Sequence, residues 1–312
     1  MSSGQKSSKK PLSVPARIDL KIGFACNNRC RFCVQGDKRE RFGRRSENEL
    51  RKILEQSRER YDGVVFTGGE PTLHPALVRL ISEARRLKYR SIQIQSNGRM
   101  FAYRDLCMRL VEAGANEFSP ALHGHRAELH DFLTTVEGSF EQTVAGIRNL
   151  KHLGQFIVTN SVITRSNFRH LPQLAELLVD LGVDQYQLAF VHPVGTALSN
   201  FSSIVPRFEM IEPYVKAALD VGISSDKTVM TEAIPHCFMD GYEDYIGERI
   251  MPSTRIFDAE GVIDEYRRYR LVEGKAKGPP CEKCKRDDIC EGPWREYPER
   301  YGWEEFRYFK KK

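Results

Sequence analysis

Short apolar runs alternate with longer segments of helical periodicity over the first two thirds of the chain. The short runs predict strands at 18–24, 63–67, 91–95, 116–122, 156–163 and 185–191. Each is followed by a segment whose apolar residues recur every three or four positions, which predicts helices at 46–60, 75–87, 104–113, 139–153, 171–181 and 207–221. Strands that alternate with helices in this way are typical of parallel βαβ units.

This repeat predicts an α/β fold. Right-handed crossovers roll successive units into a barrel or a doubly wound sheet. Six units are fewer than the eight of a closed barrel, so we expect a partial (β/α)6 TIM-like barrel over residues 16–222. The periodicity breaks down from residue 223, where we expect a small C-terminal module over 223–312. The polar segment 1–15 predicts a disordered basic tail.

Composition and charge narrow the class of protein. Hydrophobic residues make up 40% of the chain and charged residues 29%, which is a globular composition. No apolar run approaches the roughly 18 residues that span a bilayer, and no secretory signal is apparent, so we expect a soluble cytoplasmic protein without a membrane partner. The formal charge of +6 comes from lysines in the two tails, so a nucleic-acid partner is not expected.

Cysteine spacing carries the strongest chemical signal. Six of the eight cysteines fall in two groups, Cys26, Cys30 and Cys33 in one, and Cys281, Cys284 and Cys290 in the other. Cytosolic thiols stay reduced, so such groups indicate metal or redox chemistry. The first group follows the first expected strand, where a loop can wrap three thiolates around one iron–sulfur cluster. Three ligands leave one iron of a four-iron cluster open, as a catalytic site requires.

The first group, C-x3-C-x2-C with Phe32 before its third cysteine, resembles the radical S-adenosylmethionine (SAM) superfamily. Residues 67–71, Thr-Gly-Gly-Glu-Pro at the end of the second expected strand, are similar to that family's GGEP motif. The resemblance covers roughly residues 16–220. It implies a 4Fe-4S cluster on Cys26, Cys30 and Cys33, whose fourth iron is chelated by S-adenosylmethionine. An external one-electron reductant such as ferredoxin or flavodoxin would start cleavage to a 5′-deoxyadenosyl radical, which abstracts a substrate hydrogen atom.

The resemblance also implies a set of cofactor contacts at the ends of the strands. Gly68 and Gly69 would let the backbone approach the methionyl part, and Glu70 would bind its ammonium group. Phe32 would pack on the adenine side. The remaining candidates are polar residues for the ribose or methionine groups, namely Ser96, Asn97, Ser119, Asn160 and Arg165, the last for the methionine carboxylate.

The second cysteine group resembles the auxiliary-cluster modules of the superfamily, the SPASM and twitch domains. A full SPASM pattern would have a further cysteine where Trp294 stands. The resemblance implies one auxiliary 4Fe-4S cluster on Cys237, Cys281, Cys284 and Cys290. A zinc site on the same thiols is the alternative.

Function follows from these motifs as far as the reaction class. We expect a radical SAM enzyme that acts on a small molecule or peptide, either a peptide substrate or a cofactor precursor, with the auxiliary cluster aiding oxidation or binding. His123 and His125, after the fourth expected strand, are candidate catalytic residues because histidine can transfer protons near neutral pH. The alternative is an iron–sulfur or zinc electron carrier or scaffold without radical chemistry.

Overall fold

The computed structural model describes residues 16–310, so the expected basic tail at 1–15 lies outside the described residues. In this part of the chain one sheet has the strand order β7-β6-β5-β4-β3-β2-β1-β8-β9. The strands are β1 (Arg17–Gly23), β2 (Gly63–Gly68), β3 (Ser91–Ser96), β4 (Glu117–Pro120), β5 (Phe156–Ile163), β6 (Gln185–Phe190), β7 (Thr228–Glu232), β8 (Thr254–Asp258) and β9 (Gly261–Ile263). All neighbours pair in parallel except β8 and β9.

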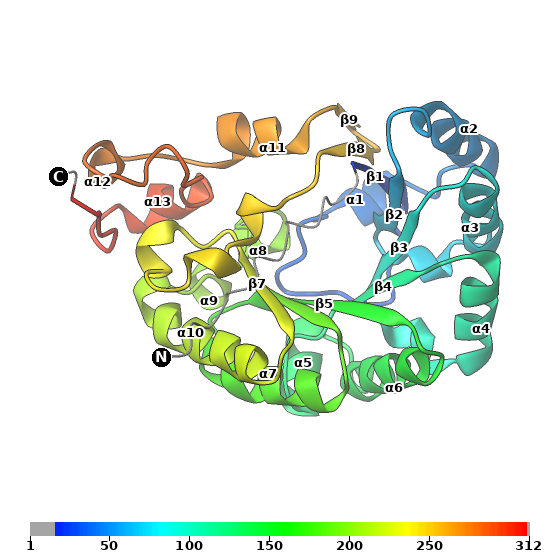
Figure 1. Ribbon diagram of the computed structural model, residues 1–312, viewed down its shortest axis with the longest axis horizontal. Helices are drawn as coiled ribbons and strands as arrows, with labels where there is room; N and C mark the ends of the chain where they lie inside the picture. The colour runs from blue at the N-terminus through cyan, green and yellow to red at the C-terminus, as the bar shows by residue number, and fades with distance from the viewer. Residues whose placement is uncertain (1–15, 311–312) are drawn as a thin grey trace, which may run out of the picture.

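Helices cover the convex side of the curved sheet (Figure 1). The longer ones are α2 (Glu47–Ser57), α3 (Leu77–Arg86), α4 (Arg104–Ala113), α5 (Ala127–Thr134), α6 (Ser139–His152), α7 (Leu171–Asp180) and α10 (Phe208–Ser224). The shorter ones are α1 (Lys38–Arg41), α8 (Thr196–Ser199), α9 (Phe201–Ile204), α11 (Tyr266–Tyr269), α12 (Pro279–Glu282) and α13 (Glu296–Tyr301). Among residues 16–310, every helix is too short or too polar to span a membrane.

The core lies between the strands and these helices. Successive side chains of a strand point to opposite faces, so β1 buries Ile18, Leu20 and Ile22 against the helices. Asp19 and Lys21 then face the concave side. Asp19 pairs with Val65 of β2, and Val65 pairs with Gln93 of β3, so Gln93 lies at the same level and on the same face of the sheet as Asp19. The concave face is therefore largely polar, and it surrounds the space in which a barrel enzyme binds its ligands.

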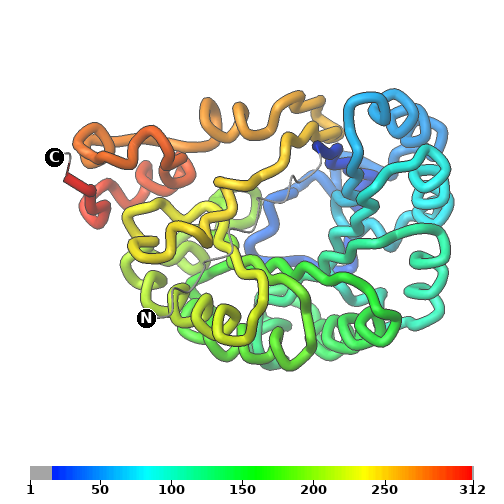
Figure 2. The backbone as a smooth tube through the Cα atoms, in the orientation of Figure 1, coloured from blue at the N-terminus to red at the C-terminus, as the bar shows by residue number. Residues whose placement is uncertain are grey.

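The six expected strands form the parallel run from β1 to β6, which confirms the open, partial barrel. The sheet also includes strands from beyond residue 222, since β7 pairs with β6, and β8 pairs with β1. Figure 2 shows the chain crossing from β7 to β1 and then returning to the C-terminus on the opposite side. A domain boundary at residue 222 stays a prediction, although the sheet includes β7, β8 and β9, which come after that residue.

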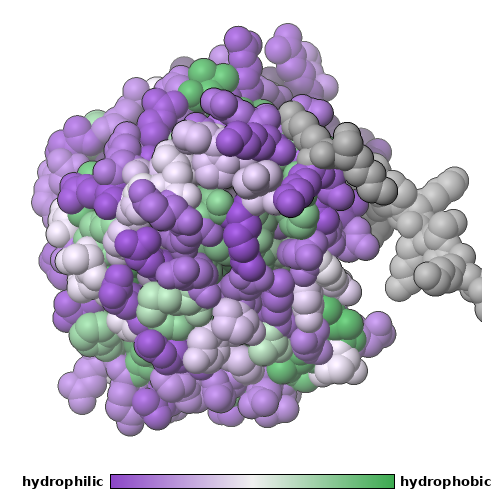
Figure 3. Space-filling view, turned by 90° about the vertical axis from the view of Figure 1, so that its left-hand side faces the viewer, coloured by the Kyte–Doolittle hydropathy of each residue, from purple (hydrophilic) through white to green (hydrophobic). Residues whose placement is uncertain are grey.

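The C-terminal segment, which follows β9, returns to the left-hand side of Figure 1 and forms part of the outer face of the molecule there. Figure 3 views it directly and shows mostly hydrophilic residues with scattered hydrophobic ones. It contains two short helices, α12 and α13, and irregular backbone, and near the C-terminus Lys310 pairs with Cys284 of the same segment. The second cysteine group therefore lies beside β7 rather than apart from the barrel.

Candidate functional site

The first cysteine group lies in the loop that follows β1. Cys26, Cys30 and Cys33 are all half-buried, and their thiols are close enough to influence one another. Burial, followed by the charges of Cys33 and Cys26, raises the pKa of the Cys30 thiol. The backbone N–H of Asn28 donates to Cys26 Sγ over 3.4 Å, which is a contact that favours a metal-bound thiolate. One shared cluster on these three thiols stays a prediction.

Backbone hydrogen bonds fix this loop from two sides. Arg29 and Arg31 donate from their backbone N–H groups to the last turn of α5, each over 3.0 Å. Thr196, at the start of α8, donates from its N–H to the Cys33 carbonyl, also over 3.0 Å. The loop is therefore held in place by the polypeptide before any ligand binds.

Gly68 and Gly69 bring the end of β2 against the start of the cysteine loop. A Cβ atom at Gly68 would lie 2.2 Å from the Gly23 carbonyl oxygen, and one at Gly69 only 2.4 Å from the Phe24 carbonyl oxygen. Gly68 also has a φ of +128°, which favours glycine. Packing against β1 thus accounts for both glycines, and their contact with the methionyl group stays a prediction.

Glu70 joins the ends of β2 and β3. Its Oε1 accepts hydrogen bonds from the Thr72 backbone N–H (3.0 Å), the Thr72 hydroxyl (2.5 Å) and the Ser96 hydroxyl (2.9 Å). Among the described residues, its Oε2 accepts only from the Asn97 backbone N–H (2.7 Å), which leaves that oxygen a lone pair for a further donor. Burial raises the pKa of this carboxyl, and the hydrogen bonds oppose the shift. Glu70, Ser96 and Asn97 are thus brought together as expected.

A second layer of polar residues, which sequence patterns did not reveal, supports this site. Asn97 Nδ2 donates to Asn27 Oδ1 (2.6 Å) and lies 3.8 Å from Cys26 Sγ. Arg99 Nη1 donates to Asn28 Oδ1 (3.0 Å), and Arg39 Nη1 to the Asn28 carbonyl (3.1 Å). Arg99 follows the turn after β3, and that position beside a strand end was the only available signal.

The two expected histidines occupy different environments. His123 is buried, its Nδ1 accepts from the Val162 N–H (3.2 Å), and the edge-to-face contact with Phe32 has a ring separation of 4.8 Å. Burial, together with the charge of His130, lowers the pKa of His123 well below its usual value, so the ring is neutral. His125 instead lies beside His170, with ring centroids 5.1 Å apart. A catalytic role for either stays a prediction.

The remaining expected cofactor residues lie along β4 and β5 and after β5. Ser119 is buried on β4, and Asn160 on β5 has a buried Oδ1 that lacks a partner among the described residues. Arg165 Nη2 donates to the Tyr301 hydroxyl of α13 over 2.9 Å. Arg165 therefore already holds the C-terminal segment, while the unpaired Asn160 oxygen can receive a donor from a ligand.

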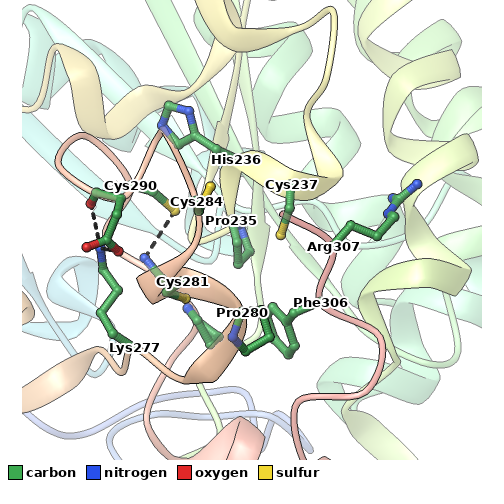
Figure 4. Close-up of a pocket in the computed structure, with 13 residues that line it drawn as sticks. Pro235, His236, Cys237, Lys277, Pro280, Cys281, Cys284, Cys290, Phe306 and Arg307 are labelled. Carbon is green, nitrogen blue, oxygen red and sulfur yellow. Dashed lines mark hydrogen bonds and ion pairs between the residues drawn. The ribbon is translucent and has the colours of Figure 1, made fainter. Parts of the chain in front are cut away.

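The second cysteine group lines a pocket of about 370 Å³, measured out to its open mouth. Figure 4 shows Cys237 on one side of it, and Cys281, Cys284 and Cys290 on the other. The N–H groups of Arg286 and Gly292 donate to Cys284 Sγ and Cys290 Sγ, each over 3.4 Å. Within residues 16–310, no three cysteine, histidine or carboxylate side chains converge on a point where a single ion would bind.

A buried ionic cluster connects this pocket to the barrel. The fully buried Arg270 donates to Glu232 at the end of β7 (2.5 Å), to Glu248 (2.7 Å) and to Glu291 (3.0 Å), which is next to Cys290. Arg270 thus ties the second cysteine group to the sheet.

Two further groups complete this cluster. The Lys275 ammonium lies 3.9 Å from the centre of the Trp294 ring and has no hydrogen-bond partner among the described residues. Burial and the Arg270 charge lower the pKa of Lys275 to about 8. Trp294, at the position of the further SPASM cysteine, also stacks on His192 at 3.7 Å. That position therefore has a packing role in this chain.

Comparison with known proteins agrees with this geometry. The family model described as "Radical SAM superfamily" matches residues 20–178. The chain is 32% identical to a "Probable GTP 3',8-cyclase" of Metallosphaera sedula over 189 residues, 59% of each chain. It is 28% identical to an "AdoMet-dependent heme synthase" of Oleidesulfovibrio alaskensis, over 62% of this chain and 50% of the relative. The matches thus span only half to three fifths of these relatives' lengths.

Solved structures share the fold at low sequence identity. Streptococcus suis SuiB bound to S-adenosylmethionine superposes with a TM-score of 0.68 at 15% identity, covering 95% of this chain and 76% of SuiB. The enzyme anSMEcpe with bound AdoMet and the Cp18Cys peptide gives a TM-score of 0.64 at 15% identity, covering 89% of both chains. The likeness extends over the C-terminal segment as well as the barrel.

Proposed function

This chain belongs to the radical SAM superfamily, and on that premise we propose that it removes a hydrogen atom from a peptide or cofactor precursor. The observation that carries the proposal is the gathering of three half-buried thiols beside Glu70, Ser96 and Asn97. The alternative of an electron carrier or scaffold does not fit a family of enzymes. The chain is thus an enzyme whose substrate is to be identified.

Cys26, Cys30 and Cys33 would hold the first 4Fe-4S cluster. When bound, the cluster and S-adenosylmethionine supply the one-electron cleavage that starts the radical reaction. Glu70 Oε2, with its free lone pair, is suited to accept from the methionine ammonium group. The unpartnered Asn160 Oδ1 is suited to a ribose hydroxyl. Arg165, already bonded to Tyr301, is a weaker candidate for the methionine carboxylate.

Cys237, Cys281, Cys284 and Cys290 would hold an auxiliary 4Fe-4S cluster. Support comes from a pocket lined by all four thiols and from two N–H groups that donate to sulfur. A pocket lined by four thiols suits an iron–sulfur cluster, which thiolates hold, and a zinc ion on the same thiols stays the alternative. This centre would accept an electron from a product radical or bind the substrate.

The concave face of the sheet indicates a polar substrate. Gln187 Nε2 donates to Glu232 Oε2 over 2.5 Å, and Ser91 Oγ donates to Glu117 Oε2 over 3.1 Å. These side chains are only part-buried, so they can also pair with a polar substrate, and a site built to form hydrogen bonds rejects analogues that lack the matching group. A small molecule or a short peptide segment fits such a surface, and a cytoplasmic location fits reduced thiols.

The test of this proposal is cofactor cleavage by protein reconstituted with iron and sulfide under anaerobic conditions. With dithionite as reductant, the wild type should form 5′-deoxyadenosine, and Cys30→Ala should form none. Cys107→Ala is the matched control, because Cys107 is buried in α4 away from both groups. Formation by Cys30→Ala at the wild-type rate would show that the first group is not the cleavage site. Deuterated candidate substrates then reveal the hydrogen that is removed.

A further inference from the structure

A second pocket lies beside the one that the four C-terminal thiols line. Its volume is about 220 Å³, measured out to its open mouth, and its walls come from residues 233–236, 246–248 and 289–292. The two pockets share one wall, made of Pro235, His236, Cys290 and Gly292. Because two of its other lining residues are Glu248 and Glu291, we refer to this second pocket as the glutamate pocket.

Three side chains that line the glutamate pocket have a buried acceptor atom without a hydrogen-bond partner among residues 16–310. These atoms are Glu248 Oε2, Glu291 Oε1 and His236 Nδ1. Arg270 takes only the other oxygen of each carboxylate, Glu248 Oε1 over 2.7 Å and Glu291 Oε2 over 3.0 Å. Buried polar atoms nearly always have a partner, so three unpaired acceptors around one pocket indicate a ligand that donates hydrogen bonds.

His236 provides evidence that does not depend on the two carboxylates. It is only 4% exposed, and Figure 4 shows its ring pointing away from the Cys237 and Cys281 thiols. With the ring proton on Nε2, its Nδ1 is an acceptor. An uncharged ring nitrogen and two carboxylate oxygens therefore require the same kind of partner, which is a hydrogen-bond donor.

The ionic cluster behind the pocket lacks one positive charge. Glu232, Glu248 and Glu291 contribute three carboxylates to it, whereas Arg270 and Lys275 contribute two cations. Burial raises the pKa of Glu248, because its charged form loses hydration that the two cations replace only in part. A ligand with one positive charge would make the cluster neutral.

The number of donors and the charge together decide which ligand fits. A water molecule donates two hydrogen bonds and has no charge, so one water would leave an acceptor unpaired and the cluster negative. A primary ammonium group has three N–H donors and one positive charge, which match the three acceptors and the missing charge. Its hydrogen bonds to carboxylates are charge-assisted and therefore stronger than those of a neutral donor.

We propose that the glutamate pocket binds a primary ammonium group, so that the substrate is a lysine-containing peptide or a small primary amine. The assignment of this group to the substrate rests on the proposed function, whereas its binding to the pocket does not. His236 and Cys290 line both pockets, so the bound ammonium group would lie beside the proposed auxiliary cluster. A substrate held there by its amine would have its remaining atoms next to that cluster.

Isothermal titration calorimetry of the reconstituted enzyme tests the site with defined probes. The probe α-N-acetyl-lysine methylamide should bind, and its norleucine counterpart, which lacks only the amino nitrogen, should not. Methylammonium that binds as tightly as the lysine probe would support a small amine as the substrate, and tighter binding of the lysine probe would support a lysine side chain. Binding of neither amine would mean that water alone fills the pocket, and equal binding of the norleucine probe would also overturn the proposal.

A substitution at the mouth of the pocket provides a variant that leaves the buried cluster intact. Ile289 lines the pocket and is 66% exposed, so Ile289→Lys supplies a tethered ammonium group that competes with the probe. It should weaken binding of the lysine probe by roughly tenfold, whereas Ile289→Met, the uncharged control, should bind it as the wild type does. Equal binding by these two variants would overturn the proposal.

A second variant removes one charge inside the pocket. Glu248→Gln keeps the shape of the side chain and should weaken binding of the lysine probe by roughly tenfold or more. Its unfolding midpoint is measured alongside, and unchanged affinity in a folded variant would contradict the site. Absence of 5′-deoxyadenosine from the wild type with dithionite would instead refute the proposed function, without touching the binding result.

Discussion

Replacing Arg270 with methionine should destabilise the protein strongly, because it removes a buried guanidinium that pairs with the buried Glu248 and the part-buried Glu232 and Glu291. Arg270 has no exposed surface and bonds to Glu232, Glu248 and Glu291 within 3.0 Å. Removing one partner of a buried ion pair costs about 3–5 kcal/mol. The neighbouring Lys275 ammonium compensates only in part, since it forms no hydrogen bond to these carboxylates. We therefore expect Arg270→Met to lose about 4 kcal/mol of unfolding free energy at pH 7.

The loss should depend on pH with a definite sign. Burial already raises the pKa of Glu248, and without Arg270 the folded-state pKa of that carboxyl rises further. A carboxyl whose pKa is raised on folding destabilises the folded state above that pKa, and the penalty fades as pH falls and the group protonates. The difference between wild type and Arg270→Met should therefore shrink between about pH 8 and about pH 5.

Guanidinium denaturation followed by circular dichroism, with both proteins at the same iron loading, measures this difference. Arg79→Met is the control, because Arg79 forms a similar two-bond pair with Glu47 on the surface and should cost far less. A loss for Arg270→Met of less than about 1 kcal/mol, or one that does not change with pH, would refute the account of a desolvated cluster.

Three further predictions concern the metal site, the glycine turn and the buried lysine. Cys284→Ala should lower iron from roughly eight towards roughly four atoms per chain while 5′-deoxyadenosine still forms; unchanged iron would contradict the auxiliary cluster. Gly69→Ala should abolish S-adenosylmethionine binding because its Cβ would meet the Phe24 carbonyl at 2.4 Å, whereas Gly43→Ala, with open space around it, should bind normally. Wild-type stability should rise by about 3 kcal/mol between about pH 8 and 10.5, since folded Lys275 loses its proton at about 8 and unfolded lysine at 10.5. In Lys275→Met that rise in stability should vanish. A rise of the same size in Lys275→Met would show that other groups cause it.

The six strand–helix units are predictable from sequence because each element repeats its apolar residues at its own period. Residues 156–163 and 104–113 match β5 and α4 at both ends. The strands β7, β8 and β9 are not predictable in this way, since they have five residues or fewer and no long helix follows any of them. β8 pairs with β1 at the other end of the chain, and local periodicity carries no information about such a pairing.

The candidate site is also predictable from sequence only in part. Spacing alone groups Cys26, Cys30 and Cys33, because ligands in one short loop must lie close together. Spacing does not reveal that His123 is buried against Phe32, since a histidine after a strand reads as a loop residue until tertiary packing is known. The role of Arg270 cannot be predicted from sequence for a related reason. Its partners are Glu232, Glu248 and Glu291, which come from separate segments, and only the folded chain places them together.

Long-range contacts that cannot be predicted from the sequence link the chain segments that contain the two cysteine groups. β8 pairs with β1, the strand that leads into the first cysteine loop. Asp258, at the end of β8, binds Lys38 of α1, the helix that follows that loop, at 2.8 Å and also binds Lys21. Although burial opposes it, these bonds lower the pKa of Asp258 to about 2, so the carboxylate stays charged at neutral pH.

Arg270 makes the second attachment, from β7 to the residue beside Cys290. The same C-terminal segment is thus fastened at both sides of the open barrel, next to each thiol group in turn. A segment held at two points by buried charges resists movement more than one held by surface pairs. The two proposed clusters would therefore keep a fixed separation from each other.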